Sequence, residues 1–123
     1  MKLFRTDDYI HMENPHPGCP FRPEILTHEH QAKDLGGMFG LLPPGSQVPY
    51  HYHQKRESLI IVIEGEAVET VEGEAFPIKT GDVLFIPAGE KHGVANRSEK
   101  NFRYLEFFTQ PPLAADFVEV PYE

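Results

Sequence analysis

The chain has 123 residues, 40% of them hydrophobic and 24% charged, which is the size and balance of one globular domain. Its formal net charge of -8 disfavours nucleic acids and anionic membranes as partners, because proteins bind both through clustered Lys and Arg. A single cysteine allows no intrachain disulfide, and neither a signal peptide nor a run of ~20 apolar residues is present, so we expect a cytoplasmic protein.

The first 35 residues differ in pattern from the rest of the chain. Four prolines lie between Pro15 and Pro23, and apolar and polar residues show little alternation. We predict that residues 1–35 form an ordered arm lying on the remaining domain or on a neighbouring subunit, with at most a turn over residues 27–34. A flexible tail is the alternative, because Pro-rich termini are often loose.

Residues 36–123 consist of short runs rich in Val, Ile, Phe and Tyr, separated by turns that contain Pro or Gly. This pattern is typical of an all-β barrel or sandwich, and no segment of helical length shows a 3.6-residue period. The run 58–63 is apolar on both faces, which predicts burial on both, and Phe85 and Phe108 are predicted core residues. Strands are predicted over residues 36–42, 48–53, 58–63, 67–71, 74–78, 82–86, 92–96, 102–108 and 117–120.

His51 and His53 are two residues apart in a predicted strand, so both imidazoles point to the same face while Tyr52 points away. Neutral imidazole is a good ligand for divalent transition metals. Protons compete for the same nitrogens, so we expect metal affinity to weaken below about pH 6.

Two residues further along the chain are candidates to complete a metal site. Glu57 follows His53 by four residues and supplies a carboxylate if the chain turns back, although a solvated glutamate beside Lys55 and Arg56 is the alternative. His92 follows a Pro-x-Gly turn that ends an apolar strand, and this turn is expected to direct the imidazole inward.

These segments resemble the two sequence motifs of the cupin superfamily. The resemblance covers residues 45–96 and implies a small antiparallel double-stranded β-helix, the jelly-roll barrel of cupins, over residues 36–123. In the first motif, the matching residues are Gly45, His51, His53, Glu57 and Gly65. In the second motif, they are Gly81, Pro87, Gly89, His92 and Asn96.

One spacing departs from the family pattern. Seven residues separate Glu57 from Gly65 where the family has six, so alignment on Gly65 brings Ser58 to the family's Glu position. A bulge at the start of the strand would keep Glu57 as a ligand. The alternative is a site of three histidines, with water or substrate in the remaining positions.

The resemblance implies one divalent metal ion, Fe, Mn, Zn or Ni, and a small-molecule substrate or ligand. Family members include dioxygenases, oxalate-acting enzymes and sugar isomerases. One hypothesis is therefore a metal-dependent oxidoreductase or isomerase that acts on a small oxygen-rich molecule, and the other is a non-catalytic binding or sensor module. Small cupins commonly dimerise through N-terminal strands, so a homodimer to which residues 1–35 contribute is expected.

Three residues outside the metal set are candidates for catalysis. Glu106 is a charge within an apolar strand, and that is costly unless it faces solvent or a polar cavity. Tyr52 and Tyr104 are candidates to line the same cavity, with ordinary packing as the alternative role.

Overall fold

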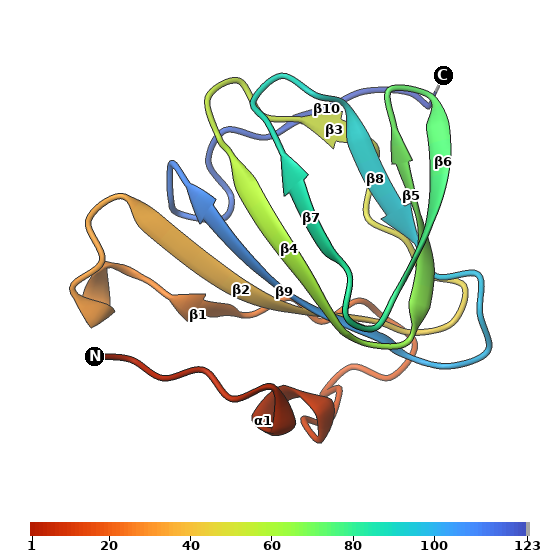
Figure 1. Cartoon of the computed structure of the whole chain (residues 1–123), viewed down its shortest axis with the longest axis horizontal. Coiled ribbons are helices and arrows are strands. Elements are labelled where there is room, and N and C mark those ends of the chain that lie inside the picture. Colours follow the sequence, from red (N-terminus) through yellow and green to blue (C-terminus); the bar gives the residue numbers. More distant parts are fainter. Residues whose placement is uncertain (123) are drawn as a thin grey trace.

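The computed structural model describes residues 1–122, and its strands form two five-stranded antiparallel sheets that enclose one core (Figure 1). The first sheet has the order β1-β2-β9-β4-β7 and the second the order β10-β3-β8-β5-β6. This confirms the predicted all-β jelly-roll barrel. The strands are β1 (Glu24–Leu26), β2 (Leu35–Leu42), β3 (His51–Tyr52), β4 (Ser58–Glu64), β5 (Glu66–Val71), β6 (Glu74–Lys79), β7 (Val83–Ile86), β8 (His92–Ala95), β9 (Phe102–Thr109) and β10 (Val118–Glu119).

Side chains that alternate along the strands fill the space between the two sheets. On β4, Ser58, Ile60 and Val62 point inward and are buried, whereas Leu59 points outward. The barrel core combines residues of both sheets: Met38, Leu42, Val48, Ile60, Val62, Ala67, Ile78, Ile86, Val94, Phe102, Tyr104 and Phe108. Each sheet therefore presents a layer of inward side chains to the other sheet. The polar residues in these layers form the candidate functional site.

A glycine lets Tyr104 lie flat against the backbone of β2. Gly40 is paired with Tyr104 across the β2–β9 ladder, and a Cβ at Gly40 would lie 2.2 Å from the tyrosine ring. Only glycine accommodates that approach, so this pair sets the position of Tyr104 inside the barrel.

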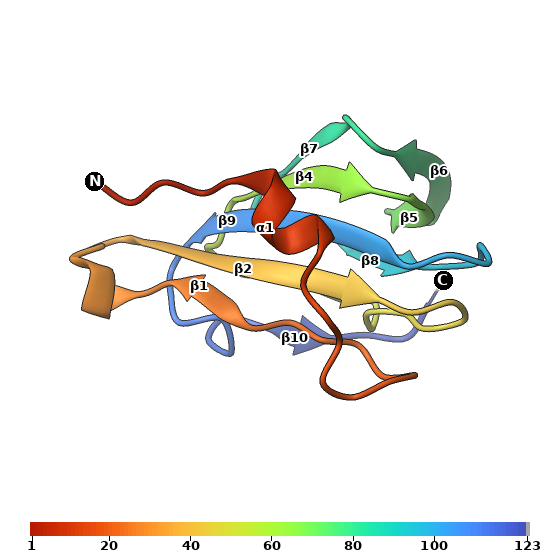
Figure 2. The ribbon, with the colours of Figure 1, turned by 90° about the horizontal axis from the view of Figure 1, so that it is seen from below.

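The N-terminal arm covers part of the outer face of the first sheet (Figure 2). It contains α1 (Thr6–Ile10), the 3-10 helix η1 (His28–His30) and β1, which pairs with β2. The Arg103 guanidinium donates from Nη1 to the carbonyl oxygens of Tyr9 and Met12, each at 2.7 Å. The apolar residues between arm and sheet are Tyr9, Ile10, Met12, Phe21 and Ile25 on one side and Phe39, Leu41, Ile63 and Leu105 on the other.

The outer face of β4 and β7 carries apolar side chains that the arm leaves exposed. Leu59 is 47% exposed, Val83 61% and Phe85 55%, and Leu59 is paired with Phe85 in the ladder. The prediction that the run 58–63 is buried on both faces is therefore wrong for Leu59. The assignment of Phe85 to the core is also wrong, because strand alternation turns it outward. We call Leu59, Val83 and Phe85 the outer patch.

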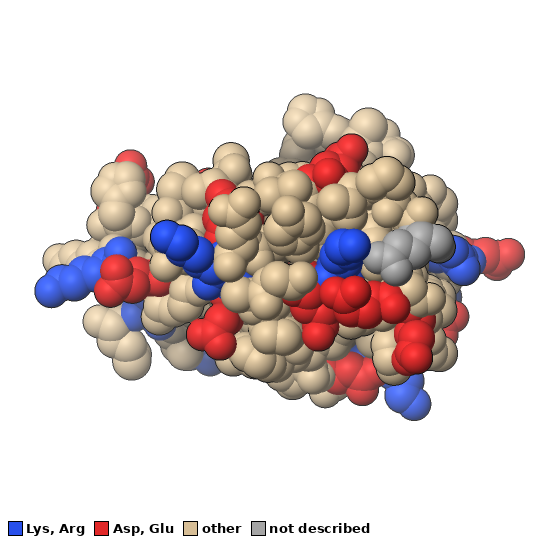
Figure 3. Space-filling model, turned by 90° about the horizontal axis from the view of Figure 1, so that it is seen from above, with Lys and Arg blue, Asp and Glu red and all other residues tan. Residues whose placement is uncertain are grey.

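The charged surface agrees with the acidic composition. On the face shown in Figure 3, Asp and Glu gather near the middle, and the Lys and Arg among them are scattered. Within the described part of the chain, the helices are too short to reach from one side of a membrane to the other.

We predict that the outer patch is the contact surface of the expected homodimer, because contiguous exposed apolar side chains mark interaction sites. Phe85→Glu should convert the dimer to a monomer in multi-angle light scattering. Leu35→Glu is the matched control, since Leu35 is 51% exposed at the start of β2, outside the outer patch. A wild-type monomer, or a dimer that survives Phe85→Glu unchanged, would refute the prediction.

Candidate metal centre

Three buried histidines meet at one end of the barrel, as predicted from their spacing. His51 on β3 is paired directly with His92 on β8, and all three side chains are 4% exposed. The ring centroid of His51 lies 4.8 Å from that of His53 and 4.4 Å from that of His92. One ring nitrogen from each residue lies within 4.8 Å of the others. This approaches the separation of ligands that share one ion, whose bonds to imidazole are about 2.1 Å long.

Each imidazole is held through Nδ1 by an acceptor on the surrounding chain. His51 Nδ1 lies 2.6 Å from the carbonyl oxygen of Pro49, and His53 Nδ1 lies 2.5 Å from that of Asp116. A carbonyl only accepts, so in both residues Nδ1 carries the proton and Nε2 keeps its lone pair. His92 donates from Nδ1 to the Glu69 carboxylate at 2.8 Å, and its Nε2 is buried without a hydrogen-bond partner.

Glu69 is a functional residue that the sequence analysis missed. It lies on β5, is 2% exposed, and orients His92 in the way that carboxylates orient metal-binding histidines. Burial raises the pKa of the Glu69 carboxyl, and the hydrogen bond from His92 opposes that rise. Its signal in the sequence was a carboxylate two residues after Ala67, on the inward face of a strand.

Burial favours the uncharged form of His51 and His53. Burial, aided by the neighbouring His92, lowers the pKa of His51 to about 3, and burial also lowers the pKa of His53. Proton competition at His51 is therefore expected at a lower pH than the value near 6 that unperturbed histidine predicts.

The structure does not bring Glu57 to the three histidines. Its side chain is exposed, because β4 begins at Ser58 and strand alternation turns Ser58 inward and Glu57 outward. The Glu57 backbone is fixed there by hydrogen bonds with Thr109 in both directions. Ser58 occupies the inward position, but its buried hydroxyl has no partner and it does not line the cavity beside the histidines. The expected carboxylate ligand is thus corrected to a cluster of three histidines.

Arg56 and Asp116 connect the loop after His53 to the C-terminal segment. The Arg56 guanidinium is 1% exposed and reaches five carbonyl oxygens, those of Thr109, Gln110, Pro112, Leu113 and Ala115. In return, the Asp116 carboxylate accepts hydrogen bonds from the backbone N–H groups of Gln54, Lys55 and Arg56. Arg56 is therefore buried although its neighbours Lys55 and Glu57 are exposed, because its partners lie more than 50 residues away in the sequence.

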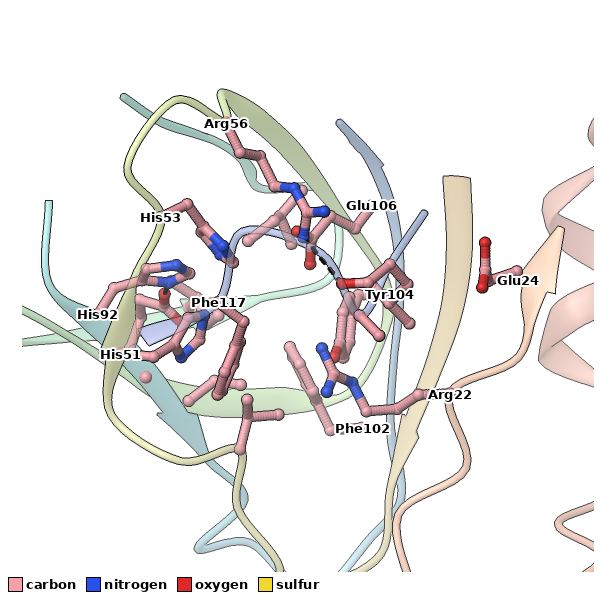
Figure 4. A pocket seen from close by; sticks show the side chains of 18 residues that line it. Arg22, Glu24, His51, His53, Arg56, His92, Phe102, Tyr104, Glu106 and Phe117 are labelled. Carbon is pink, nitrogen blue, oxygen red and sulfur yellow. Dashed lines mark hydrogen bonds and ion pairs between the residues drawn. The ribbon is translucent and has the colours of Figure 1, made fainter. Parts of the chain in front are cut away.

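A cavity of about 420 Å³ opens beside the histidine cluster (Figure 4). Tyr104 and Glu106 of β9 line it, in agreement with the suggestion that Glu106 faces a polar lumen. Burial raises the pKa of the Tyr104 hydroxyl. Tyr52 does not line the cavity, because it alternates with His51 and His53 and points away. Phe117 stacks on His51 with ring centroids 4.4 Å apart and closes one side.

Comparison with known proteins places these features in a family. The cupin domain model matches residues 38–108. The chain is 38% identical over 64 residues to the oxalate-binding protein of Thermotoga maritima, a match that covers 52% of this chain and 53% of that protein. The chain spans about half the length of the first curated relatives that it matches.

Solved structures show the same fold. A conserved Klebsiella pneumoniae protein with a double-stranded β-helix domain superimposes with a TM-score of 0.78 at 24% identity, over 98% of each chain. A predicted oxalate decarboxylase from Thermotoga maritima superimposes with a TM-score of 0.70 at 28% identity, over 75% of this chain and 81% of that one.

The metal-free protein should lose stability as the pH falls below about 6.5. His51 has a pKa near 6.5 when unfolded and about 3 when folded, so between these values the unfolded state binds more protons and acid favours unfolding. Urea unfolding at pH 7.5, 6 and 5 should show a smaller loss of stability in His51→Gln than in the wild type. The exposed His28→Gln is the control, and equal losses in all three proteins would contradict this account.

Arg56→Lys should destabilise the protein by at least about 2 kcal/mol, because an ammonium cannot replace the charged hydrogen bonds of the buried guanidinium. Urea unfolding measures the loss, and limited proteolysis should locate new cleavage between residues 109 and 117. Lys55→Gln, at an exposed neighbouring position, should behave as wild type. An Arg56→Lys protein as stable as the wild type would show that these contacts contribute little.

Proposed function

The chain belongs to the cupin family, and from that premise we propose that it binds one divalent metal ion on His51, His53 and His92 and acts on a small oxygen-rich molecule in the adjoining cavity. The observation that carries the proposal is the buried Nε2 of His92. It has no hydrogen-bond partner, although its imidazole is held by Glu69 and lies in a cluster with two further histidines. A buried ring nitrogen without a partner is costly unless something occupies the space in front of it.

The donor set narrows the choice of metal. A carboxylate from Glu57 would favour Fe or Mn over Zn, but the cluster lacks one. Three neutral imidazoles suit the borderline ions Fe, Ni and Zn better than the harder Mn. When bound, such an ion supplies Lewis acidity, and sites with three protein ligands keep a position for substrate or water.

The chain's own residues supply the rest of the proposed site. Glu69 holds His92 in one tautomer, and Asp116 and Pro49 do the same for the other two histidines through their carbonyls. We propose that Glu106 and Tyr104 contact the substrate and exchange protons with it, because both are buried and line the cavity. Tyr52 has no place in this proposal, since it lies outside the cavity wall.

The second candidate function is non-catalytic binding of a small molecule. It is favoured by the relative from Thermotoga maritima, which is an oxalate-binding protein. The cavity beside the histidines suits both functions. Turnover of any bound small molecule by the metal-loaded protein, lost in Glu106→Gln with binding retained, would favour the enzyme.

Metal binding tests the proposal shared by both candidates. The metal-free protein should bind about one equivalent of Zn(II), with a rise in melting temperature of several degrees, because the ion binds only the folded site. His51→Gln and His92→Gln should lose both effects. Glu57→Gln and His28→Gln should retain them, since both side chains are exposed outside the cluster. Binding that is absent in the wild type, or unaffected by His92→Gln, would disprove the proposed centre.

A further inference from the structure

We infer that the ligand of this cavity is a small carboxylate with an apolar body, and that Arg22 of the N-terminal arm holds its carboxylate. This inference rests on the proposed function, since the ligand shares the cavity with the metal ion. It names the chemical class of the ligand and a residue that determines specificity.

The backbone around Arg22 points its side chain into the barrel. Phe21 exchanges two backbone hydrogen bonds with Leu41, and Phe39 N–H donates to the carbonyl oxygen of Pro23. The segment thus runs beside β2 in extended form, with Phe21 packed on the outer face of the sheet. Alternation then directs Arg22 inward, and Figure 4 shows its guanidinium across the cavity from the three histidines.

The guanidinium of Arg22 has an N–H donor without a hydrogen-bond partner in the protein. Its Nε is buried without a hydrogen-bond partner, Nη2 makes a long contact of 3.6 Å to the sulfur of Met38, and the guanidinium also interacts with the Tyr104 hydroxyl. Arg56, the other arginine in the cavity wall, already donates hydrogen bonds to five carbonyl oxygens. A planar guanidinium with free N–H groups matches a carboxylate in two-point geometry.

The charges around the cavity also favour an anion. The two buried carboxylates in its wall, Glu69 and Glu106, balance the two guanidinium groups, and Glu24 lies exposed at the rim. A divalent ion on the histidines would make the buried part of the site positive. An anionic ligand offsets part of this positive charge, and a neutral one does not.

The remaining residues of the cavity wall determine the chemistry of the part of the ligand beyond its carboxylate. The residues that line the cavity in the described chain include no Ser, Thr, Asn, Gln or Lys. Aromatic and aliphatic side chains make up most of the surface, among them Ile60, Phe102, Leu113 and Phe117. A sugar would leave hydroxyl groups without partners here, at a cost for each one. An apolar body instead gains from burial against these side chains.

Ligand binding to the Zn(II)-loaded protein tests the inference, with 3-phenylpropionate as the probe and the neutral 3-phenylpropanamide as its isostere. Isothermal titration should show that the wild type prefers the acid. Arg22→Gln should weaken binding of the acid by about 10- to 100-fold, the loss expected for a charged hydrogen-bonded pair, and binding of the amide by less than about threefold. Arg97→Gln removes the same charge from an exposed position and should change neither affinity.

Four outcomes overturn the inference: no binding of 3-phenylpropionate by the wild type, equal losses for acid and amide in Arg22→Gln, a loss in Arg97→Gln as large as in Arg22→Gln, or tighter binding of glucuronate, a sugar acid, than of the probe. If Arg22→Gln does not fold, Arg22→Lys keeps the charge but not the two-point geometry. Arg22→Lys should weaken binding of the acid more than binding of the amide. Equal losses of affinity for the two ligands would again overturn the inference. Zn(II) titration without ligand separates this result from failure of the metal centre.

Discussion

The burial of one guanidinium, that of Arg56, organises the open end of this barrel. A charge removed from water must be compensated by hydrogen bonds, and five carbonyl oxygens of the segment 109–115 supply them. The segment can therefore follow only the path that keeps those carbonyls turned toward Arg56. That path brings Asp116 back to the loop after His53 and places Phe117 against His51. The geometry of the histidine cluster thus depends on a residue that makes no hydrogen bond to its imidazoles.

The site combines a largely apolar cavity with a few polar groups whose orientations are fixed by hydrogen bonds. Strand pairing brings His51 opposite His92, and the acceptors around them leave each Nε2 free. Burial keeps His51 and His53 uncharged, which is the state that a metal ion requires. The same burial makes every unsatisfied donor or acceptor informative, because few alternatives to a ligand exist inside the barrel. Two such atoms, His92 Nε2 and Arg22 Nε, belong to residues that line one cavity from opposite sides.

The family relationship limits the chemistry without selecting a reaction. Cupins share the barrel and the motif histidines, and the relatives of this chain include an oxalate-binding protein. In this chain the cavity wall is apolar apart from the three histidines, arginine, glutamate and one tyrosine. The arm contributes to this wall through Arg22, so it lines the cavity in addition to covering the sheet.

The sequence by itself determined the strands beyond residue 35 and the convergence of His51, His53 and His92, because alternation and turn residues are local properties. The resemblance to the cupin motifs added the jelly-roll class, whereas β1 in the arm was not predicted. The sequence also contained the evidence against Glu57, since alignment on Gly65 already brought Ser58 to the inward position. Only the tertiary structure decided the partners of these residues. Glu69 meets His92 and Arg22 faces the histidines because strands distant in sequence pair there, and Arg56 is buried although its neighbours Lys55 and Glu57 are exposed. Such contacts depend on which chain segments pack together, and no local pattern records that choice.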